Sequence, residues 1–164
     1  MTKALLLSAC LLLTTTAAQA GAPIVRTGAP AAPIAASVEV PAGSDIVYLS
    51  GMLPPVADPG APPGTPAAYG DTTTQTVNLF KHMQAVLAEK GLTLGDVVMM
   101  RIYMVGDPAK AGHMDFAGMM AGYKQFFGTP DQPNKPARST VQVAGLAATG
   151  PAMEIEVTAA RPPK

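Results

Sequence analysis

The order of strand-like and helix-like segments in this chain predicts an α+β fold, with two helices packed on one face of a sheet. The segments follow one another in the order β-β-α-β-α-β-β. Residues 72–90 and 116–127 repeat apolar side chains at helical spacing, whereas the remaining segments alternate or are rich in β-branched residues. No internal repeat is present, so we expect a single domain, which we place at residues 34–161.

Two short strands and a long loop are expected at the start of this domain. Residues 34–40 and 46–50 have strand composition, and Pro41-Ala42-Gly43-Ser44-Asp45 between them suggests a hairpin-like connection. The preceding residues, 21–33, are expected to form a flexible lead-in. The stretch from Pro54 to Gly70 contains six prolines and three glycines, so it is predicted to be a loop.

One helix is predicted before, and the other after, a central strand in the sequence. Thr72 and Gln75 have the spacing of a capping box at the start of the first helix, which should end at Lys90-Gly91. Residues 97–105 are β-rich and largely apolar on both faces, so we expect a central strand that is covered on both sides. The second helix should end at Gly128, with its periodic large side chains in the core. These are Phe116, Met120, Tyr123 and Phe127.

The last two predicted strands, 136–143 and 153–161, carry the most suggestive charges. The linker between them contains Gly145, Gly150 and Pro151, which can reverse the chain, so we expect the two strands to be neighbours.

Arg138 lies on the first of these strands, and Glu154 and Glu156 lie on the second. The spacing i, i+2 places both acids on one face. An arginine beside one of them would offer a fork for a substrate carboxylate and a base for a water molecule. A cross-strand ion pair without function is the alternative interpretation.

The first twenty residues have the composition of a secretory signal peptide. Lys3 precedes an apolar run of about ten residues around Leu5 to Leu13, which is too short to span a bilayer, and Ala18-Gln19-Ala20 supplies an Ala-x-Ala end before Gly21. We therefore expect a signal peptide at 1–20, a mature chain that begins near Gly21, and a periplasmic or secreted protein without membrane attachment after cleavage. Lipidation at Cys10 is the alternative, because Leu7-Ser8-Ala9-Cys10 fits the pattern at which bacterial lipoproteins are cleaved.

Composition excludes several classes of chemistry. Cys10 is the only cysteine, so a mature chain without it has no disulfide, thiol catalysis or cysteine-bound metal. Without Lys3, ten basic residues face eleven acidic ones, and a net charge of −1 without a basic run does not suit a nucleic-acid binder. His82 and His113 each fall in a predicted helix without the ligand spacing of a metal site. No phosphate loop, dinucleotide fingerprint or Gly-x-Ser-x-Gly motif is present, and we expect no cofactor.

The C-terminal strands also carry a family resemblance. The pattern Pro-Ala-Arg-Ser-x-Val-x-Val-Ala-x-Leu, followed by x-Glu-Ile-Glu-x-x-Ala, resembles the signature of the Rid family, the YjgF-like reactive intermediate (imine) deaminases, also called endoribonuclease L-PSP. Val47-Tyr48-Leu49-Ser50-Gly51 resembles the second strand of that family, and the resemblance covers roughly Ile34 to Ala160. It implies a chorismate-mutase-like fold and a homotrimeric barrel with sites between subunits.

The resemblance also implies roles for individual residues. Arg138 would bind the carboxylate of a 2-imino or enamine acid, and Glu154 would position the attacking water. Ser50 would line the cleft, and Thr140, where many relatives have cysteine, would contribute chiefly its backbone. Hydrolysis of an imine needs only orientation, a carboxylate anchor and a proton acceptor, so no metal or organic cofactor is implied.

Two positions depart from the family pattern. Ala36 and Ser37 fall where the family has a tyrosine in its first strand, and Met120 replaces an asparagine three residues before Tyr123. Three hypotheses follow: an imine deaminase outside the cytoplasm, a protein that binds small carboxylates without turnover, and a chaperone-like holdase.

Overall fold

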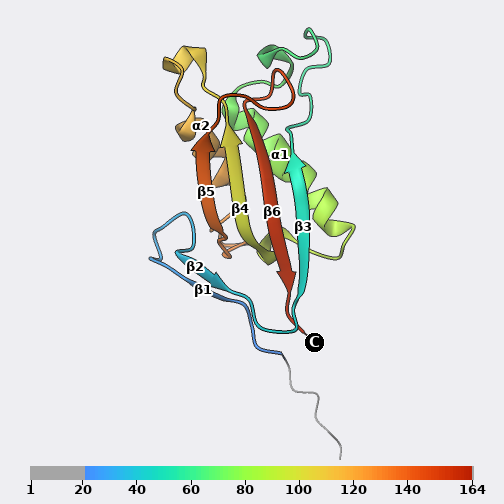
Figure 1. The fold of residues 1–164 in the computed structure, drawn as a ribbon, viewed down its shortest axis with the longest axis vertical. Helices are drawn as coiled ribbons and strands as arrows, with labels where there is room; N and C mark the ends of the chain where they lie inside the picture. The colour runs from blue at the N-terminus through green and yellow to red at the C-terminus, as the bar shows by residue number, and fades with distance from the viewer. Residues whose placement is uncertain (1–20, 164) are drawn as a thin grey trace, which may run out of the picture.

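The computed structural model describes residues 21–163, whose fold is drawn in Figure 1. It confirms the predicted α+β architecture, in which two helices pack on one face of a mixed sheet. The predicted signal peptide lies outside the described residues. The elements are β1 (Val25–Thr27), β2 (Ser37–Glu39), β3 (Asp45–Met52), η1 (Pro66–Ala68), α1 (Thr72–Ala88), η2 (Leu94–Asp96), β4 (Val97–Met104), η3 (Pro108–Lys110), α2 (Phe116–Tyr123), β5 (Ala137–Gln142) and β6 (Met153–Arg161).

The main sheet has four strands in the order β3-β6-β4-β5. β4 is the central strand, as predicted, and it pairs antiparallel with β6 and parallel with β5. The prediction that β5 and β6 are neighbours is wrong, because β4 lies between them. The crossover through α2 places β5 parallel to β4 on one side, and β6 then pairs with the other side of β4.

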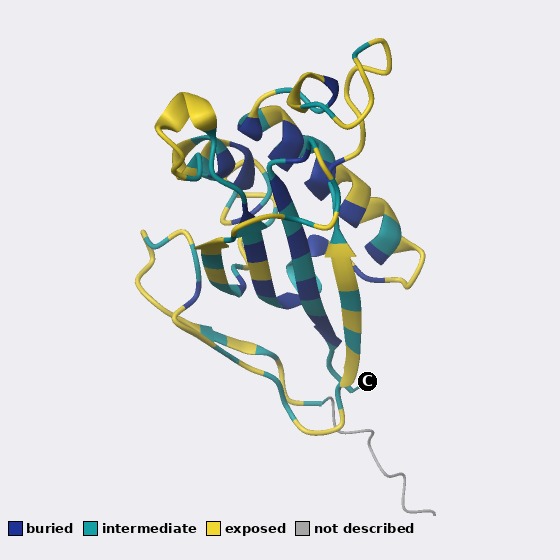
Figure 2. Ribbon diagram, turned by 45° about the horizontal axis from the view of Figure 1, so that its top comes forward, coloured by how far each residue is buried: buried dark blue, intermediate teal, exposed yellow. Residues whose placement is uncertain are grey.

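The core lies between the helices and one face of this sheet. Met100, Ile102 and Met104 of β4 are fully buried, whereas Arg101 is exposed and Tyr103 is half-buried. β6 alternates in the same way between buried and half-buried residues, as Figure 2 shows. The prediction that both faces of β4 are covered is wrong for the described chain, because both helices lie on one side. We call the other side the open face; it carries Ser50, Arg101, Tyr103, Glu154 and Glu156, among others.

α1 begins with a cap that differs from the predicted one. The side chain of Asp71, not that of Thr72, caps the helix, because its Oδ1 accepts a hydrogen bond from Thr74 N at 2.7 Å. Gln75 does not complete a capping box, since its amide bonds to Gly70 O and Ala152 N instead. The buried stripe follows the predicted spacing and includes Leu79, Phe80, Met83 and Leu87.

α2 is shorter than predicted, and its aromatic residues divide between core and surface. Tyr123 and Phe127 stack at 4.9 Å between ring centroids, and Phe80 of α1 packs against both rings. Phe127 lies beyond the end of the helix but is still buried. Phe116, which was predicted to lie in the core, is instead 45% exposed. His113 was predicted to lie in a helix, but it lies in the turn before α2 and bridges to Asp107.

The N-terminal segment forms a small sheet of its own. β1 pairs antiparallel with β2, so the predicted lead-in at 21–33 contains a strand that the sequence analysis missed. The hairpin-like connection expected between 34–40 and 46–50 is absent, since β2 and β3 belong to different sheets. Arg26 ties β1 to the domain through bonds from Nη2 to Gly95 O at 2.9 Å and Val97 O at 3.2 Å.

The proline-rich segment from Pro54 to Gly70 is a loop, as predicted, and contains only the short turn η1. None of the helices described within residues 21–163 is long and apolar enough to cross a membrane.

Candidate functional site

Arg138 lies on the outer strand β5, on the face that the helices cover. Its partner across the strand pair is the buried Met100, and residues paired in this way present their side chains on the same face. The guanidinium carbon lies 4.3 Å from the ring centroid of Tyr123, and Nη2 lies 3.2 Å from Sδ of Met120. The pKa of Arg138 is lowered by burial, and the neighbouring Tyr123 offsets part of this effect. The guanidinium nevertheless stays charged at every pH that a protein meets.

Tyr123 forms a fixed wall beside this cation. Its ring is fully buried, and its hydroxyl donates a hydrogen bond to Pro33 O at 3.0 Å. Burial raises the pKa of Tyr123 to about 12, although the charge of Arg138 acts in the opposite direction. A neutral ring with its hydroxyl turned away leaves the guanidinium stacked on an aromatic face rather than paired with an acid.

Thr140 follows Arg138 at i+2 and shares its face, since its partner on β4 is the buried Ile102. Two buried polar atoms on this face, Arg138 Nη1 and Thr140 Oγ1, have no hydrogen-bond partner in the described part of the chain. Buried polar groups are almost always paired, so these two atoms can bind water or a ligand from outside this chain. An oxygen anion suits the guanidinium, because its N–H groups can only donate.

Ser50 and Glu154 both lie on the open face, and the Glu154 carboxylate lies against Gly51, the residue after Ser50. Ser50 is exposed near the end of β3, beside the irregularity in the pairing between Leu49 and Met52. Gly51 follows it, and any Cβ at position 51 would overlap Oε1 of Glu154. The Ser-Gly pair therefore has a physical reason: the missing side chain leaves room for the Glu154 carboxylate next to Ser50.

The two acids of β6 have different surroundings. Glu156 Oε1 accepts a hydrogen bond from Arg101 Nη1 at 2.7 Å and one from the Tyr103 hydroxyl at 3.3 Å. The pKa of Tyr103 is raised, first by burial and then by the charge of Glu156. Glu154 has no hydrogen bond or ion pair among residues 21–163. The cross-strand ion pair considered for Arg138 is absent from the described residues; Glu156 pairs with Arg101 instead, and Glu154 is free to act on a ligand.

Arg138 and Glu154 do not meet within one chain. Met100 pairs with Arg138 on one side and with Val157 on the other, so Arg138 shares a face with Val157. Glu154 and Glu156 point to the opposite face. The arrangement considered from the sequence, with Arg138 beside one of the two acids, is therefore not formed within a single chain. The structure instead places Arg138 with Thr140 under α2 and both Ser50 and Glu154 on the open face, and we call these two pairs the half-sites.

The cavities of the described chain do not contain both half-sites. A shallow hollow of about 250 Å³ on the open face includes Ser50, Arg101 and Glu156 in its lining. A better-enclosed cavity, of about 400 Å³, lies between the starts of the two helices and includes none of the four predicted residues. Among residues 21–163, no group of three His, Cys, Asp or Glu side chains could hold a metal ion.

Three contributors to these half-sites were not predicted as site residues. Tyr123 was assigned to the core, and its position in the helical repeat did not indicate that its ring would stack against the guanidinium of Arg138. Met120 was noted as a departure from the family pattern, but its sulfur contact with Arg138 follows only from the packing of α2 over β5. Gly51 was noted only as part of the Ser-Gly pair, and its role depends on where Glu154 lies.

A family model described as Endoribonuclease L-PSP matches residues 27–161 of this chain. The RutC family protein of Haemophilus influenzae is 30% identical over 138 residues, which cover 84% of this chain and 96% of the relative. A protein of Escherichia coli named "Putative reactive intermediate deaminase TdcF" is 31% identical over 116 residues, which cover 71% of this chain and 79% of the relative.

Solved structures share the fold. The crystal structure of Escherichia coli TdcF with bound serine has 30% sequence identity and a TM-score of 0.54, and the match covers 82% of this chain and 96% of that one. The Rid family protein YyfB from Yersinia pestis has a TM-score of 0.58 at 23% identity, covering 77% and 86% of the two chains. At that identity the second match bears on the fold alone.

Proposed function

Because this chain belongs to the endoribonuclease L-PSP family, the Rid family of the sequence analysis, we propose that it hydrolyses reactive 2-imino and enamine acids to 2-oxo acids and ammonia. Substrates of the 2-aminoacrylate, 2-iminopropanoate or 2-iminobutanoate type suit the site. The similarity to a protein named as a reactive intermediate deaminase supports a hydrolase of this general type. One observation carries the proposal: Arg138 is a half-buried cation whose buried Nη1 has no partner in the described chain.

The unpartnered guanidinium is suited to a small carboxylate. A carboxylate can accept two parallel N–H bonds from one arginine, and such charge-assisted bonds are stronger than neutral ones. Thr140 Oγ1, the second unpartnered atom on this face, can donate to the same anion. The relative TdcF has been crystallised with serine, which also carries a carboxylate on a short carbon chain.

Glu154 is the group best placed to act on water. An imine carbon is already electrophilic, so the protein has to hold the substrate and accept a proton as water adds. The resulting carbinolamine then loses ammonia to give the 2-oxo acid. Glu156 is committed to Arg101 and Tyr103, whereas Glu154 has no partner among the described residues and lies over Gly51 beside Ser50.

A homotrimer would unite the two half-sites. β3 and β5 are the outer strands of the main sheet, and in this assembly the β5 side of one subunit would approach the open face of the next. Large apolar side chains are exposed on that face, namely Tyr48 at 79%, Val141 at 44% and Ile46 at 41%. Exposed apolar groups of this kind suit burial against another subunit. We therefore propose sites shared between subunits, with Arg138 and Thr140 from one and Ser50 and Glu154 from its neighbour.

Subunit complementation tests this arrangement. Arg138→Ala and Glu154→Gln should each be inactive alone in ammonia release from freshly generated 2-iminopropanoate. After the two variants are unfolded together and refolded as mixed trimers, about a quarter of the sites combine both native groups, so about a quarter of the wild-type activity should return. Two copies of the same variant refolded together are the control. Failure of the mixture to regain activity would refute the shared site.

A protein that binds small carboxylates without turnover is the second candidate. Met120 places a thioether beside Arg138, so this part of the site has no polar group from α2 except the distant Tyr123 hydroxyl, which is turned to Pro33. Calorimetric binding of 2-oxobutanoate with no ammonia release would favour this candidate. Neither binding nor release would leave the third hypothesis, a chaperone-like holdase.

We also propose that the protein acts in the periplasm or outside the cell, on the basis of the signal-like composition of its first twenty residues.

A further inference from the structure

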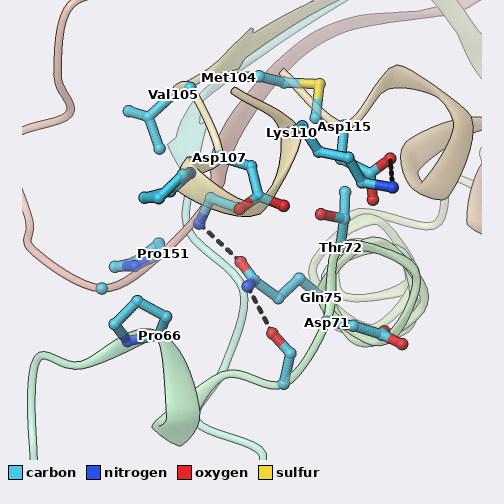
Figure 3. Close-up of a pocket in the computed structure, with 15 residues that line it drawn as sticks. Pro66, Asp71, Thr72, Gln75, Met104, Val105, Asp107, Lys110, Asp115 and Pro151 are labelled. Atoms are coloured by element: carbon cyan, nitrogen blue, oxygen red, sulfur yellow. Dashed lines mark hydrogen bonds and ion pairs between the residues drawn. The ribbon is translucent and has the colours of Figure 1, made fainter. Parts of the chain in front are cut away.

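The cavity between the starts of α1 and α2 has a volume of about 400 Å³ and is separate from both half-sites (Figure 3). Its walls come from the end of β4, the turn η3, the first turn of α1 and the residues before β6. Ligand pockets typically measure about 300 to 1,000 Å³, so its size suits a small molecule.

Gln75 fixes two walls of this cavity. It is only 2% exposed, its Nε2 donates to Gly70 O at 2.9 Å, and its Oε1 accepts from Ala152 N at 2.7 Å. Both bonds are drawn in Figure 3. The loop before α1 and the segment before β6 are therefore held to the helix, and the cavity is a built feature rather than a gap between loops.

Thr72 presents an unused hydroxyl to this space. The residue is 7% exposed, and its side-chain oxygen makes no hydrogen bond within residues 21–163. Figure 3 shows the hydroxyl directed across the cavity toward Asp107. A hydroxyl of a largely buried residue that lines a cavity and has no partner within residues 21–163 can bind a ligand there.

Asp107 supplies a charge opposite this hydroxyl. Its Oδ1 accepts a hydrogen bond from Ala109 N at 2.8 Å, which starts the turn η3. Its second oxygen has no partner among the described residues. The carboxylate can therefore hold η3 with one oxygen and a cation with the other.

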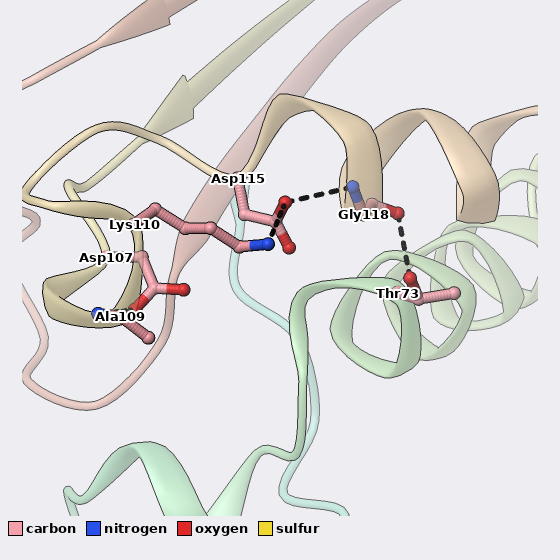
Figure 4. A network of polar contacts seen from close by, with 6 residues as sticks. All are labelled: Thr73, Asp107, Ala109, Lys110, Asp115 and Gly118. Atoms are coloured by element: carbon pink, nitrogen blue, oxygen red, sulfur yellow. Dashed lines mark hydrogen bonds and ion pairs between the residues drawn. The ribbon is translucent and has the colours of Figure 1, made fainter.

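The other charges at the cavity are already engaged, as Figure 4 shows for two of them. Asp115 caps α2 by accepting from Gly118 N at 3.2 Å, and Lys110 Nζ lies 3.7 Å from the same carboxylate oxygen. Asp71 caps α1. The lining thus holds three carboxylates and one ammonium, a formal charge of −2, which favours a cation.

We propose that this cavity binds a small primary-amine cation, with its ammonium group between Asp107 and Thr72 and its alkyl chain against Met104, Val105 and Pro151. An ammonium has three donors and no acceptor, which matches a carboxylate oxygen and a hydroxyl oxygen. The apolar part of the lining removes the chain from water. A bare metal ion suits the cavity less well, because no three acids or histidines of the described chain converge as ligands.

Calorimetric titration with n-butylammonium tests the proposal, with butyrate and n-butanol as probes of equal chain length. We expect n-butylammonium to bind the full-length protein, to bind more weakly as salt is added, and to bind at least tenfold more tightly than either of the other two probes. Equal affinity for the three probes, or no binding of the amine, would overturn the proposal.

Two variants should change the affinity in opposite directions. Asp107→Asn removes the charge but keeps an oxygen for the Ala109 N–H, and it should weaken amine binding roughly tenfold. Lys110→Gln removes the competing cation and should tighten binding several-fold. Asp131→Asn, at an acid that does not line the cavity, is the matched control and should change nothing. Unchanged amine affinity in Asp107→Asn would contradict the proposal. If Asp107→Asn does not fold, unchanged or weaker amine binding in Lys110→Gln would contradict it instead.

Discussion

The stability of this protein should fall in alkaline solution because of Tyr123, and Tyr123→Phe should remove that fall. The hydroxyl is buried and donates to Pro33 O at 3.0 Å. Burial raises the pKa of the side chain to about 12, from an unperturbed value of 10.0. The folded protein therefore keeps this proton in a pH range where the unfolded chain has lost it.

The magnitude follows from the linkage between proton binding and unfolding. The stabilising contribution is fully present below pH 10 and is lost as the pH rises toward 12, because the unfolded state binds fewer protons in that window. A rise of about two pKa units corresponds to roughly 3 kcal/mol, and about half of it should be lost by pH 11. The Phe variant lacks the bond to Pro33, which lowers its free energy of unfolding by about 1 kcal/mol at every pH.

Denaturant unfolding at a fixed protein concentration, between pH 8 and pH 11, measures this difference. The wild-type free energy of unfolding should fall by about 1.4 kcal/mol more than that of Tyr123→Phe over this range. Tyr69→Phe, at a tyrosine outside the Arg138 cluster, should retain the wild-type slope. Parallel pH profiles for wild type and Tyr123→Phe would refute the reasoning, since they would mean that the hydroxyl titrates equally in the folded and unfolded states.

Three further predictions concern the two half-sites. Arg138→Ala should weaken binding of 2-oxobutanoate by about 2 kcal/mol or more, roughly thirtyfold. Arg138→Lys should also weaken binding, because lysine cannot form the two parallel hydrogen bonds that a guanidinium offers a carboxylate. Unchanged affinity in calorimetry would contradict this prediction. Glu154→Gln should slow imine hydrolysis with 2-oxo acid binding retained, whereas Glu156→Gln should be much less affected; equal losses in an ammonia-release assay would mean that the wrong acid is assigned. Gly51→Ala should displace the Glu154 carboxylate, so hydrolysis should fall while 2-oxobutanoate still binds, and wild-type turnover would argue against the observed packing.

Local patterns in the sequence predicted the elements better than they predicted the neighbours of each element. The helical spacing around Phe80, Met83 and Leu87 identified α1, and the β-rich segment around Met100 identified the central strand. The order of strands depends on long-range pairing, so the Gly- and Pro-rich linker after β5 gave no sign that β6 would cross to the far side of β4. β1 was missed because three residues are too few to establish a period.

The same limit applies to the candidate site. Periodicity correctly placed Glu154 and Glu156 on one face, because both lie on one strand. It could not relate that face to the face of Arg138, since the relation between strands depends on register, and the register sets Arg138 level with Met100 and Val157. The distinction between the two acids also needed the structure, in which Arg101 from a third segment pairs with Glu156 and leaves Glu154 without a partner.

The surroundings of Arg138 indicate why it should select an anion. A guanidinium that loses water on burial must be compensated, and an aromatic ring with a thioether sulfur compensates it only in part. No carboxylate of the described chain pairs with it, so its charge is not cancelled within the subunit. A carboxylate that enters this place gains the full charge-assisted contact without first displacing an internal acid, whereas a neutral ligand of the same shape leaves Nη1 without a partner. The preference for a substrate carboxylate therefore follows from the absence of an acidic partner for Arg138 within the described chain. This preference should persist even where turnover of the substrate is slow.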